Sequence, residues 1–99
     1  MKLRFEFLTL FRHKIGQESL TVQVADRPGK SPTVREALQA LEESLGSRQL
    51  GLLTAGGVAE NLLIFRKTPA GALERIRDPE DESVEPGQSL VLSIAMDGG

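Results

Sequence analysis

The segment from Thr33 to Gly46 constrains the fold most strongly, because it is the clearest amphipathic helix in the 99-residue chain. Thr33 and Glu36 have capping-box spacing, and Gly46 stands where a left-handed C-cap is favoured. Apolar residues recur at helical spacing on one face, and polar residues face water on the other. The apolar set is Val34, Ala37, Leu38, Leu41 and Leu45, and the water-facing set is Arg35, Glu36, Gln39, Glu42 and Glu43. One helix with one apolar face needs a sheet to cover.

Two segments near the N-terminus alternate apolar and polar residues with the period of a half-buried strand. Residues 2–11 predict the first strand, although Leu8 and Leu10 break the alternation and indicate burial on both faces or a bulge. Residues 19–24 predict the second strand, and the polar turn around Gly16 predicts an antiparallel hairpin. The inward residues would be Leu3, Phe5 and Phe7, then Leu20, Val22 and Val24.

The remaining segments predict further strands. Residues 61–67 predict a buried strand, residues 73–77 a short edge strand, and residues 89–96 a last strand with Leu90, Leu92, Ile94 and Met96 on one face. Residues 47–60 fit a connection or a weak strand. The expected fold class is α+β: a single mixed sheet of four to five strands, with one main helix on one face and the other face open. We expect residues 1–99 to form one domain with a flexible C-terminal Gly-Gly tail.

Composition excludes several kinds of function. The chain has no cysteine, which excludes disulfides, zinc–thiolate sites and a cysteine nucleophile. His13 is the single histidine, so no histidine metal cluster is expected, and its polar setting indicates a surface residue rather than a catalytic base. A net charge of −2 gives no basic face for nucleic acid. No apolar run approaches a membrane span or a signal peptide, so we expect a cytoplasmic protein.

The chain ends "SIAMDGG", and two glycines after an apolar strand add nothing to a core. Such a tail fits a protein whose C-terminus reacts, or whose tail extends into a partner. The reacting group would be the terminal carboxylate of Gly99, and Gly98 would let the tail enter a channel only as wide as the backbone. The internal pair Gly56–Gly57 has no terminal carboxylate, and a loop explains it.

The whole order of elements, with "SPTVREAL" at the helix start and "PGQSLVLSIAMDGG" at the end, resembles the MoaD/ThiS sulfur carriers. This family includes the small subunit of molybdopterin synthase, is related to the ubiquitin-related modifier, and has the ubiquitin-like β-grasp fold. The chain differs in having Pro86–Gln88 before the last strand, where many carriers have Asp-Gly-Asp, and Asp97 before the glycines.

The resemblance implies a carrier protein that is not itself an enzyme and that binds no cofactor or metal of its own. An E1-like adenylyltransferase would use ATP to adenylate the Gly99 carboxylate. A sulfur donor would then displace AMP and leave a thiocarboxylate. A larger synthase subunit or another sulfur-acceptor enzyme would take the sulfur, in molybdopterin (molybdenum cofactor) biosynthesis.

Two other functions stay open. A ubiquitin-like modifier would be joined through Gly99 to lysines, or would supply sulfur for tRNA thiolation. A non-covalent β-grasp interaction module would not use its glycines. In each case the open sheet face is the expected partner surface. The acidic residues between Asp78 and Glu85 fit a solvated loop or a contact with a basic patch on an activating enzyme.

Overall fold

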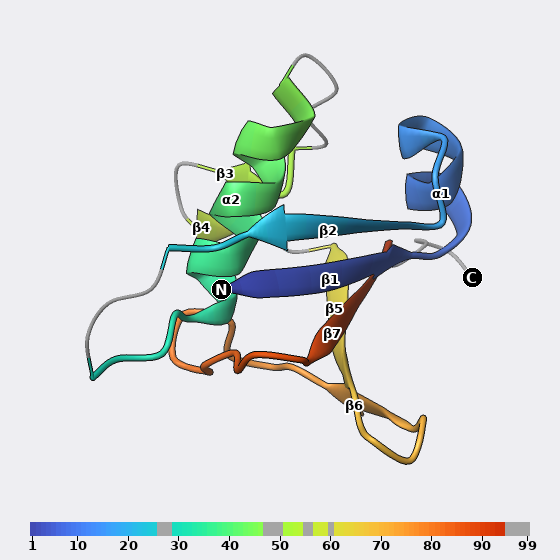
Figure 1. The fold of residues 1–99 in the computed structure, drawn as a ribbon. Coiled ribbons are helices and arrows are strands. Elements are labelled where there is room, and N and C mark those ends of the chain that lie inside the picture. Colours follow the sequence, from blue (N-terminus) through green and yellow to red (C-terminus); the bar gives the residue numbers. More distant parts are fainter. Residues whose placement is uncertain (26–28, 47–50, 55–56, 60, 95–99) are drawn as a thin grey trace.

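The computed structural model describes residues 1–25, 29–46, 51–54, 57–59 and 61–94 (Figure 1). The elements in chain order are β1 (Lys2–Phe7), α1 (Thr9–Ile15), β2 (Ser19–Gln23), α2 (Val34–Leu45), β3 (Leu53–Thr54), β4 (Gly57–Val58), β5 (Leu62–Lys67), β6 (Leu73–Arg75) and β7 (Ser89–Ile94). Neither described helix combines the length and hydropathy that a bilayer crossing requires.

The main sheet has five strands in the order β2-β1-β7-β5-β6. β1 and β7 run parallel, with Phe5 opposite Leu90, and every other neighbouring pair in this sheet is antiparallel. α2 crosses one face of the sheet (Figure 1). The predicted α+β class, the mixed sheet and the main helix on one face are therefore confirmed.

The hydrophobic core lies between α2 and the face of the sheet that we call the inner face. Phe5, Leu90 and Leu92 point to this face from the two parallel strands and are almost completely buried. Leu38 and Leu41 meet them from α2 and have no exposed surface. Burying each such side chain stabilises the fold by about 1.5–3 kcal/mol, so the helix periodicity seen in the sequence supplies much of the core.

The predicted capping box at the start of α2 is present. The Thr33 hydroxyl oxygen accepts a hydrogen bond from the Glu36 backbone N–H at 3.2 Å, and the Thr33 N–H donates to the Glu36 carboxylate at 3.5 Å. The C-terminal end differs from the prediction. Gly46 has a positive φ of 57° but a ψ of −115°, outside the left-handed helical region.

Thr33→Ala is expected to lower the free energy of unfolding by about 1 kcal/mol, because the mutation removes the acceptor for an N–H in the first helical turn. Urea unfolding monitored by circular dichroism measures this change. Thr33→Ser is the matched control, since serine keeps the hydroxyl acceptor. Equal stability of the alanine and serine variants would contradict the capping role.

The predicted first strand was too long and the predicted turn after it was wrong, because residues 9–11, assigned to the strand, and residues 12–15, assigned to the turn, together form α1. β1 ends at Phe7, and β2 pairs with it antiparallel as predicted, but a helix joins the two strands. Phe11 and Ile15 stand one helical turn apart and are both 3% exposed. Gly16 ends α1 in the left-handed conformation, φ 80°, and its N–H donates to the Arg12 carbonyl. The i, i+4 apolar pair followed by glycine was the available signal.

Glu42 was also predicted wrongly, since it was assigned to the water-facing side of α2. Its side chain is buried, with 9% of the residue exposed, and its carboxylate accepts a hydrogen bond from the Leu52 backbone N–H at 2.5 Å. Leu52 is itself buried and leads into the ribbon of β3 and β4. The ambiguous segment therefore includes a short two-stranded ribbon, although Ser47–Leu50, Ala55, Gly56 and Glu60 lie outside the described residues.

Candidate functional site

The predicted reactive tail continues from the central strand of the sheet. β7 lies between β1 and β5, and its last residue, Ile94, is paired with Leu62 of β5. Leu92 is fully buried, and its carbonyl accepts a hydrogen bond from the Leu8 N–H at 3.0 Å. Strands on both sides and the start of α1 thus fix the point from which the tail departs. Gly98 and Gly99 lie outside the described residues, as does Met96.

α1 brings basic side chains to the same end of the sheet. Its last turn carries Arg12, His13 and Lys14, which is the favourable sign of charge at a helix C-terminus. The Arg12 guanidinium lies 3.9 Å from the Glu18 carboxylate, and both side chains are largely exposed. His13 is exposed, as predicted, but on a helix rather than in a turn.

The outer face of the sheet, opposite α2, carries an apolar row. Register places Val91 of β7 beside Phe65 of β5, with Leu63 and Leu73 on the same face. Leu73 is 47% exposed, and the two β5 residues are half-buried. No described helix covers this face (Figure 1), so Leu63, Phe65 and Leu73 form an apolar surface that is partly exposed.

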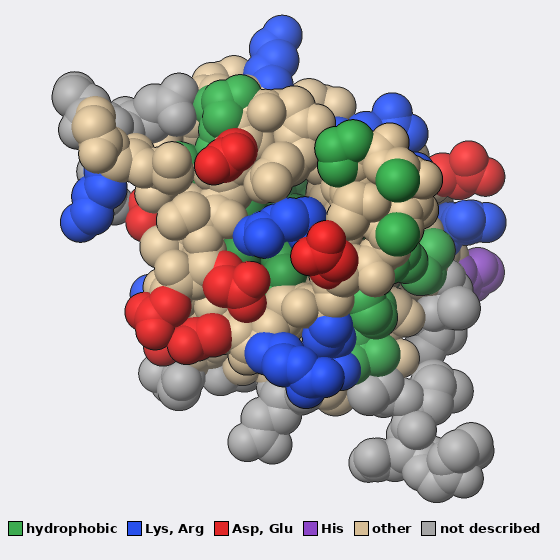
Figure 2. All heavy atoms as spheres, turned by 90° about the horizontal axis from the view of Figure 1, so that it is seen from below, with side chains coloured by type: hydrophobic (Ala, Val, Ile, Leu, Met, Phe, Trp, Pro, Cys, Tyr) green, Lys and Arg blue, Asp and Glu red, His purple; other side chains and the backbone are tan. Residues whose placement is uncertain are grey.

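An ion pair explains why Val91 is only 3% exposed on this uncovered face. The Lys67 ammonium of β5 lies 3.3 Å from the Glu6 carboxylate of β1, and β7 runs between these two strands. The two long side chains therefore cross β7 beside Val91. The view from below in Figure 2 shows acidic and basic side chains intermingled, next to a band of hydrophobic side chains.

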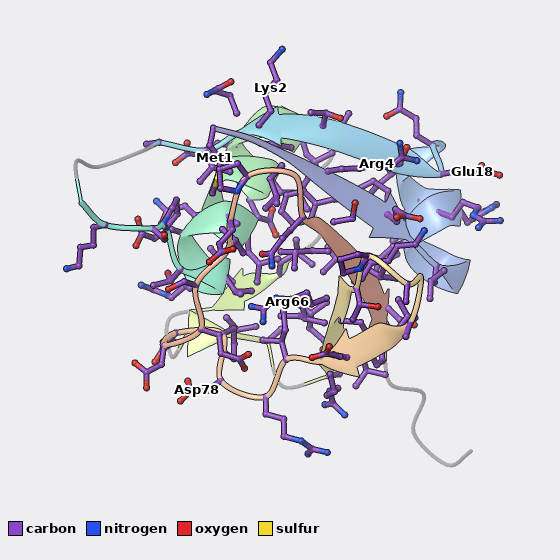
Figure 3. The ribbon with its side chains drawn as sticks, turned by 60° about the horizontal axis from the view of Figure 1, so that its bottom comes forward. Met1, Lys2, Arg4, Glu18, Arg66 and Asp78 are labelled. Atoms are coloured by element: carbon purple, nitrogen blue, oxygen red, sulfur yellow. The ribbon has the colours of Figure 1, made fainter. Side chains whose placement is uncertain are left out.

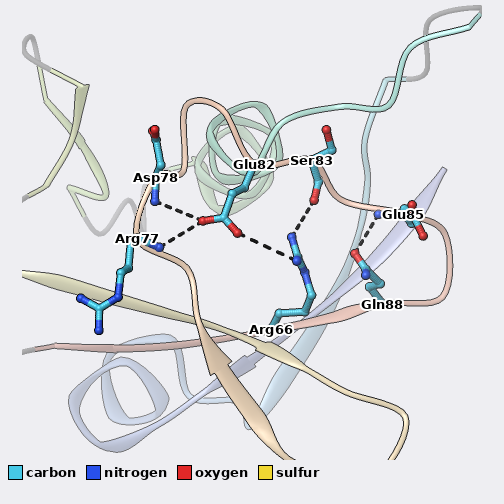
Figure 4. Close-up of polar contacts among 7 residues, drawn as sticks. All are labelled: Arg66, Arg77, Asp78, Glu82, Ser83, Glu85 and Gln88. Carbon is cyan, nitrogen blue, oxygen red and sulfur yellow. Dashed lines mark hydrogen bonds and ion pairs between the residues drawn. The ribbon is translucent and has the colours of Figure 1, made fainter.

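The acidic loop is partly built into the fold. Glu82 accepts hydrogen bonds from the backbone N–H groups of Arg77 at 3.1 Å and Asp78 at 3.2 Å, and its other oxygen lies 3.9 Å from the Arg66 guanidinium (Figure 4). Arg66 extends from β5 toward this loop (Figure 3) and donates to the Ser83 carbonyl at 2.7 Å. Glu82, which was predicted to be part of a solvated or docking loop, instead holds this loop against the sheet through its contact with Arg66.

The same loop also completes the start of α2. The Glu82 carbonyl accepts from the Val34 N–H at 2.8 Å, and the Pro79 carbonyl accepts from the Arg35 N–H at 2.9 Å. Helix N-terminal amides have no partner within the helix, so these contacts meet a requirement that the capping box leaves open. The other acids of the loop, Asp78, Glu80, Asp81 and Glu85, are exposed, and the Glu80 carboxylate lies 3.8 Å from the Arg35 guanidinium of α2.

Asp78 and Asp81 form a pair of neighbouring carboxyls at the exposed end of this loop. The hydrogen bond between their side chains raises the pKa of Asp81, and the negative charge of Asp78 raises it further. A raised pKa means that the folded chain holds this proton more tightly than the unfolded chain. The contribution to stability is therefore present at low pH and is lost as the pH rises through the folded-state pKa.

Asp78→Asn is expected to lower the pKa of Asp81, because it removes the neighbouring negative charge and replaces a charged hydrogen-bond acceptor by a neutral, weaker one. Titration of the side-chain carboxyl carbons by NMR measures this value. Glu85→Gln removes one acidic charge elsewhere in the loop and is the control. A pKa of Asp81 that stays the same in Asp78→Asn would contradict the pairing.

Sequence reasoning missed two features. The basic last turn of α1, which lies at the tail end of the sheet, was assigned to a loop. The contact of Glu82 with Arg66, at the other end of β7, joins residues that only the folded chain brings together. Within the described ranges, no group of three or more His, Asp or Glu side chains is placed to hold a metal ion.

Comparisons with known proteins bear on the fold. The sequence matches no protein-family model and no curated protein. The structure is similar to SAMP1 of Haloferax volcanii, small archaeal modifier protein 1, with TM-score 0.74, 18% identity and 100% of both chains covered. It is also similar to the HVO 2177 protein of that organism, with TM-score 0.74, 23% identity, and 100% of this chain and 87% of the other covered.

A third similar structure is CysO, from the BexX/CysO complex of Amycolatopsis orientalis. The TM-score is 0.63 at 20% identity, covering 98% of this chain and 99% of the other. At these identities the likeness bears on architecture, and all these proteins share a mixed sheet with one main helix. The chain therefore has the ubiquitin-like β-grasp fold that its resemblance to the MoaD/ThiS carriers predicted.

Proposed function

We propose that this chain is a sulfur carrier protein whose reactive group is the C-terminal carboxylate of Gly99. The observation that carries the proposal is the join between fold and tail: the central strand β7 ends at Ile94, and five residues ending in Gly98 and Gly99 follow. Extended backbone spans up to about 3.3–3.6 Å per residue, so five residues reach roughly 16–18 Å. A tail of that length can deliver a carboxylate into a partner's active site while the domain stays outside.

The proposed chemistry has two steps. In the first, the Gly99 carboxylate attacks the α-phosphorus of ATP on an E1-like adenylyltransferase, and pyrophosphate leaves. In the second, the sulfur of a hydrosulfide-level donor attacks the acyl carbon, the bond to AMP breaks, and a thiocarboxylate and a proton result. The carrier supplies the carboxylate and its reach, whereas ATP, catalysis and sulfur come from partners. A reaction of this kind places the carrier in the cytoplasm with its ATP-dependent partner.

The proposed docking surface is the apolar row on the outer face. Leu63, Phe65 and Leu73 offer apolar area, and the charged side chains around them can set the orientation of the partner. Leu63 is paired with Ser93, beside the last residue of β7, so a partner bound at that end of the row is close to the base of the tail. We propose that both the activating enzyme and a larger synthase subunit of molybdopterin biosynthesis bind this face in turn.

Intact mass spectrometry of the protein from its native cell, handled without reductants, tests the proposal. The expected species has one terminal oxygen replaced by sulfur, and fragmentation should place the sulfur on Gly99. A chain that carries only oxygen at Gly99 under sulfur-replete growth, or that extends beyond Gly99, would overturn it.

A ubiquitin-like modifier is the second candidate, and the structural similarity to a protein named as a small archaeal modifier favours it. Here a lysine amine of a target attacks the activated Gly99 carbonyl, AMP leaves, and an isopeptide bond forms. The same mass measurement separates the two functions. Peptides branched at lysine through Gly99 support a modifier, and their absence from cells that contain the thiocarboxylate supports a carrier alone.

A further inference from the structure

β2 is an edge strand whose outward backbone groups can be assigned. It has β1 on one side and, among the strands that the structure describes, none on the other. Just beyond its two ends, the Glu18 carbonyl accepts a hydrogen bond from the Phe7 N–H of β1 at 2.9 Å, and the Val24 carbonyl accepts one from the amino group of Met1, which precedes β1, at 2.9 Å. Backbone direction alternates along an antiparallel strand, so even-numbered residues face β1. The N–H and C=O groups of Ser19, Thr21 and Gln23 therefore point away from the sheet.

The β2 edge lacks the usual protection against strand addition. Proteins protect sheet edges with short strands, charged side chains, proline or a covering segment. The opposite edge follows this rule, since β6 has three residues and includes Glu74 and Arg75. β2 has five residues, with neither charge nor proline from Ser19 to Gln23. The two edges thus differ in their capacity to accept another strand.

A groove of about 330 Å³ lies between the end of β2 and α2. Its lining residues are Gln23, Val24, Ala25, Glu36, Gln39, Ala40 and Glu43. These lining residues include two carboxylates, those of Glu36 and Glu43, and no basic side chain. Glu43 is exposed and accepts a hydrogen bond from the Gln39 amide at 3.4 Å, so its carboxylate is held at the wall of the groove.

The charge of this groove selects the occupant. In a second copy paired edge to edge, two antiparallel β2 strands would place two α2 helices side by side, with the Glu36 and Glu43 carboxylates of both copies near one another. Like charges brought together across an interface are unfavourable. A cationic strand meets the opposite condition, because lysine or arginine stems can lie over Ala40 while their charged ends reach the two carboxylates.

We propose that the β2 edge and its groove bind an extended segment of a partner protein that carries lysine or arginine at alternate positions, as a sixth strand of the sheet. The outward backbone groups of Thr21 and Gln23 supply the pairing, and Glu36 and Glu43 select the charge. This surface is on the opposite edge of the sheet from β6.

Titration with an end-capped heptapeptide of alternating lysine and threonine, followed by NMR amide shifts, tests the proposal. Shifts are expected at Thr21, Gln23 and Glu43, and not along β6. The same peptide with glutamate in place of lysine is expected to produce none. Shifts centred on β6, or equal shifts with the glutamate peptide, would overturn the proposal. Shifts along β2 that grow with protein concentration in the absence of peptide would also overturn it, in favour of self-pairing.

Variants sharpen the test. Thr21→Pro removes an outward N–H without touching the pairing to β1, so binding should be lost, whereas Thr21→Val keeps the N–H and should bind. Glu43→Lys should weaken binding at least about tenfold. Glu74→Lys makes the same charge change on β6 and should bind like the unaltered protein. If Glu43→Lys binds the peptide undiminished, or if Glu74→Lys weakens binding equally, the acidic groove beside β2 is not the binding site.

Discussion

Deletion of Gly99 is expected to lower the rate of thiocarboxylate formation at least about 100-fold while leaving the fold intact. The shortened chain still ends in a carboxylate, that of Gly98, but this group lies one residue, about 3.3–3.6 Å, short of the reacting position. A misplacement of about 1 Å in a reacting group can cost about 100-fold in rate. Folding should be unaffected, because β7 ends five residues before the terminus.

The measurement is the rate of thiocarboxylate formation with the native activating enzyme, ATP and sulfide, beside the thermal unfolding midpoint of each variant. Asp97→Asn is the matched control, since it changes the tail without changing its length. A Gly99-deleted chain that is charged with sulfur at the normal rate would show that the reaction does not require the carboxylate at the position of Gly99. A fall in the unfolding midpoint would indicate instead that the tail contributes to folding.

Glu42→Ala is expected to lower the free energy of unfolding by about 1–3 kcal/mol, because it leaves a buried backbone N–H without its acceptor. The mutation removes the acceptor for the Leu52 N–H, in a place where Leu52 is 1% exposed and water cannot substitute freely. It also releases the segment that leads into β3 and β4 from α2. Chemical denaturation measures the change, and hydrogen exchange at the Leu52 amide should quicken.

Glu43→Ala provides the control, because Glu43 is the next residue on the same helix and is exposed. A substitution at such a position usually changes stability by less than about 0.5 kcal/mol. Glu42→Gln should retain most of the stability, since the amide oxygen can still accept from Leu52. Equal effects of Glu42→Ala and Glu43→Ala would contradict the structural role of the buried carboxylate.

The predictions that succeeded depended on local pattern. The capping pair Thr33 and Glu36, the helix spacing from Val34 to Leu45, the apolar run of β5 and the alternation in β7 each report on a few neighbouring residues. The errors arose where local and tertiary signals competed. α1 has no side-chain N-cap and only seven residues, so its stability comes from burying Phe11 and Ile15 in the shared core.

The loop before β7 shows the same division. Composition indicated a solvated acidic segment, and four of its acids are indeed exposed. Glu82 differs only because Arg66 of β5 and the backbone of residues 77 and 78 lie beside it in the folded chain. No spacing rule links a residue on one strand to a residue sixteen positions later, so this contact could not be read from the sequence.

The sequence by itself determined the helix with its cap and the strand alternation that makes a one-sided core, because each of these depends on the order of nearby residues. Only the tertiary structure decided that β7 lies between β1 and β5, that α1 stands beside the base of the tail, and that β2 is an edge with an acidic groove. These features depend on backbone hydrogen bonds and packing between segments that are distant in the sequence, and such contacts form only when the chain folds around its core.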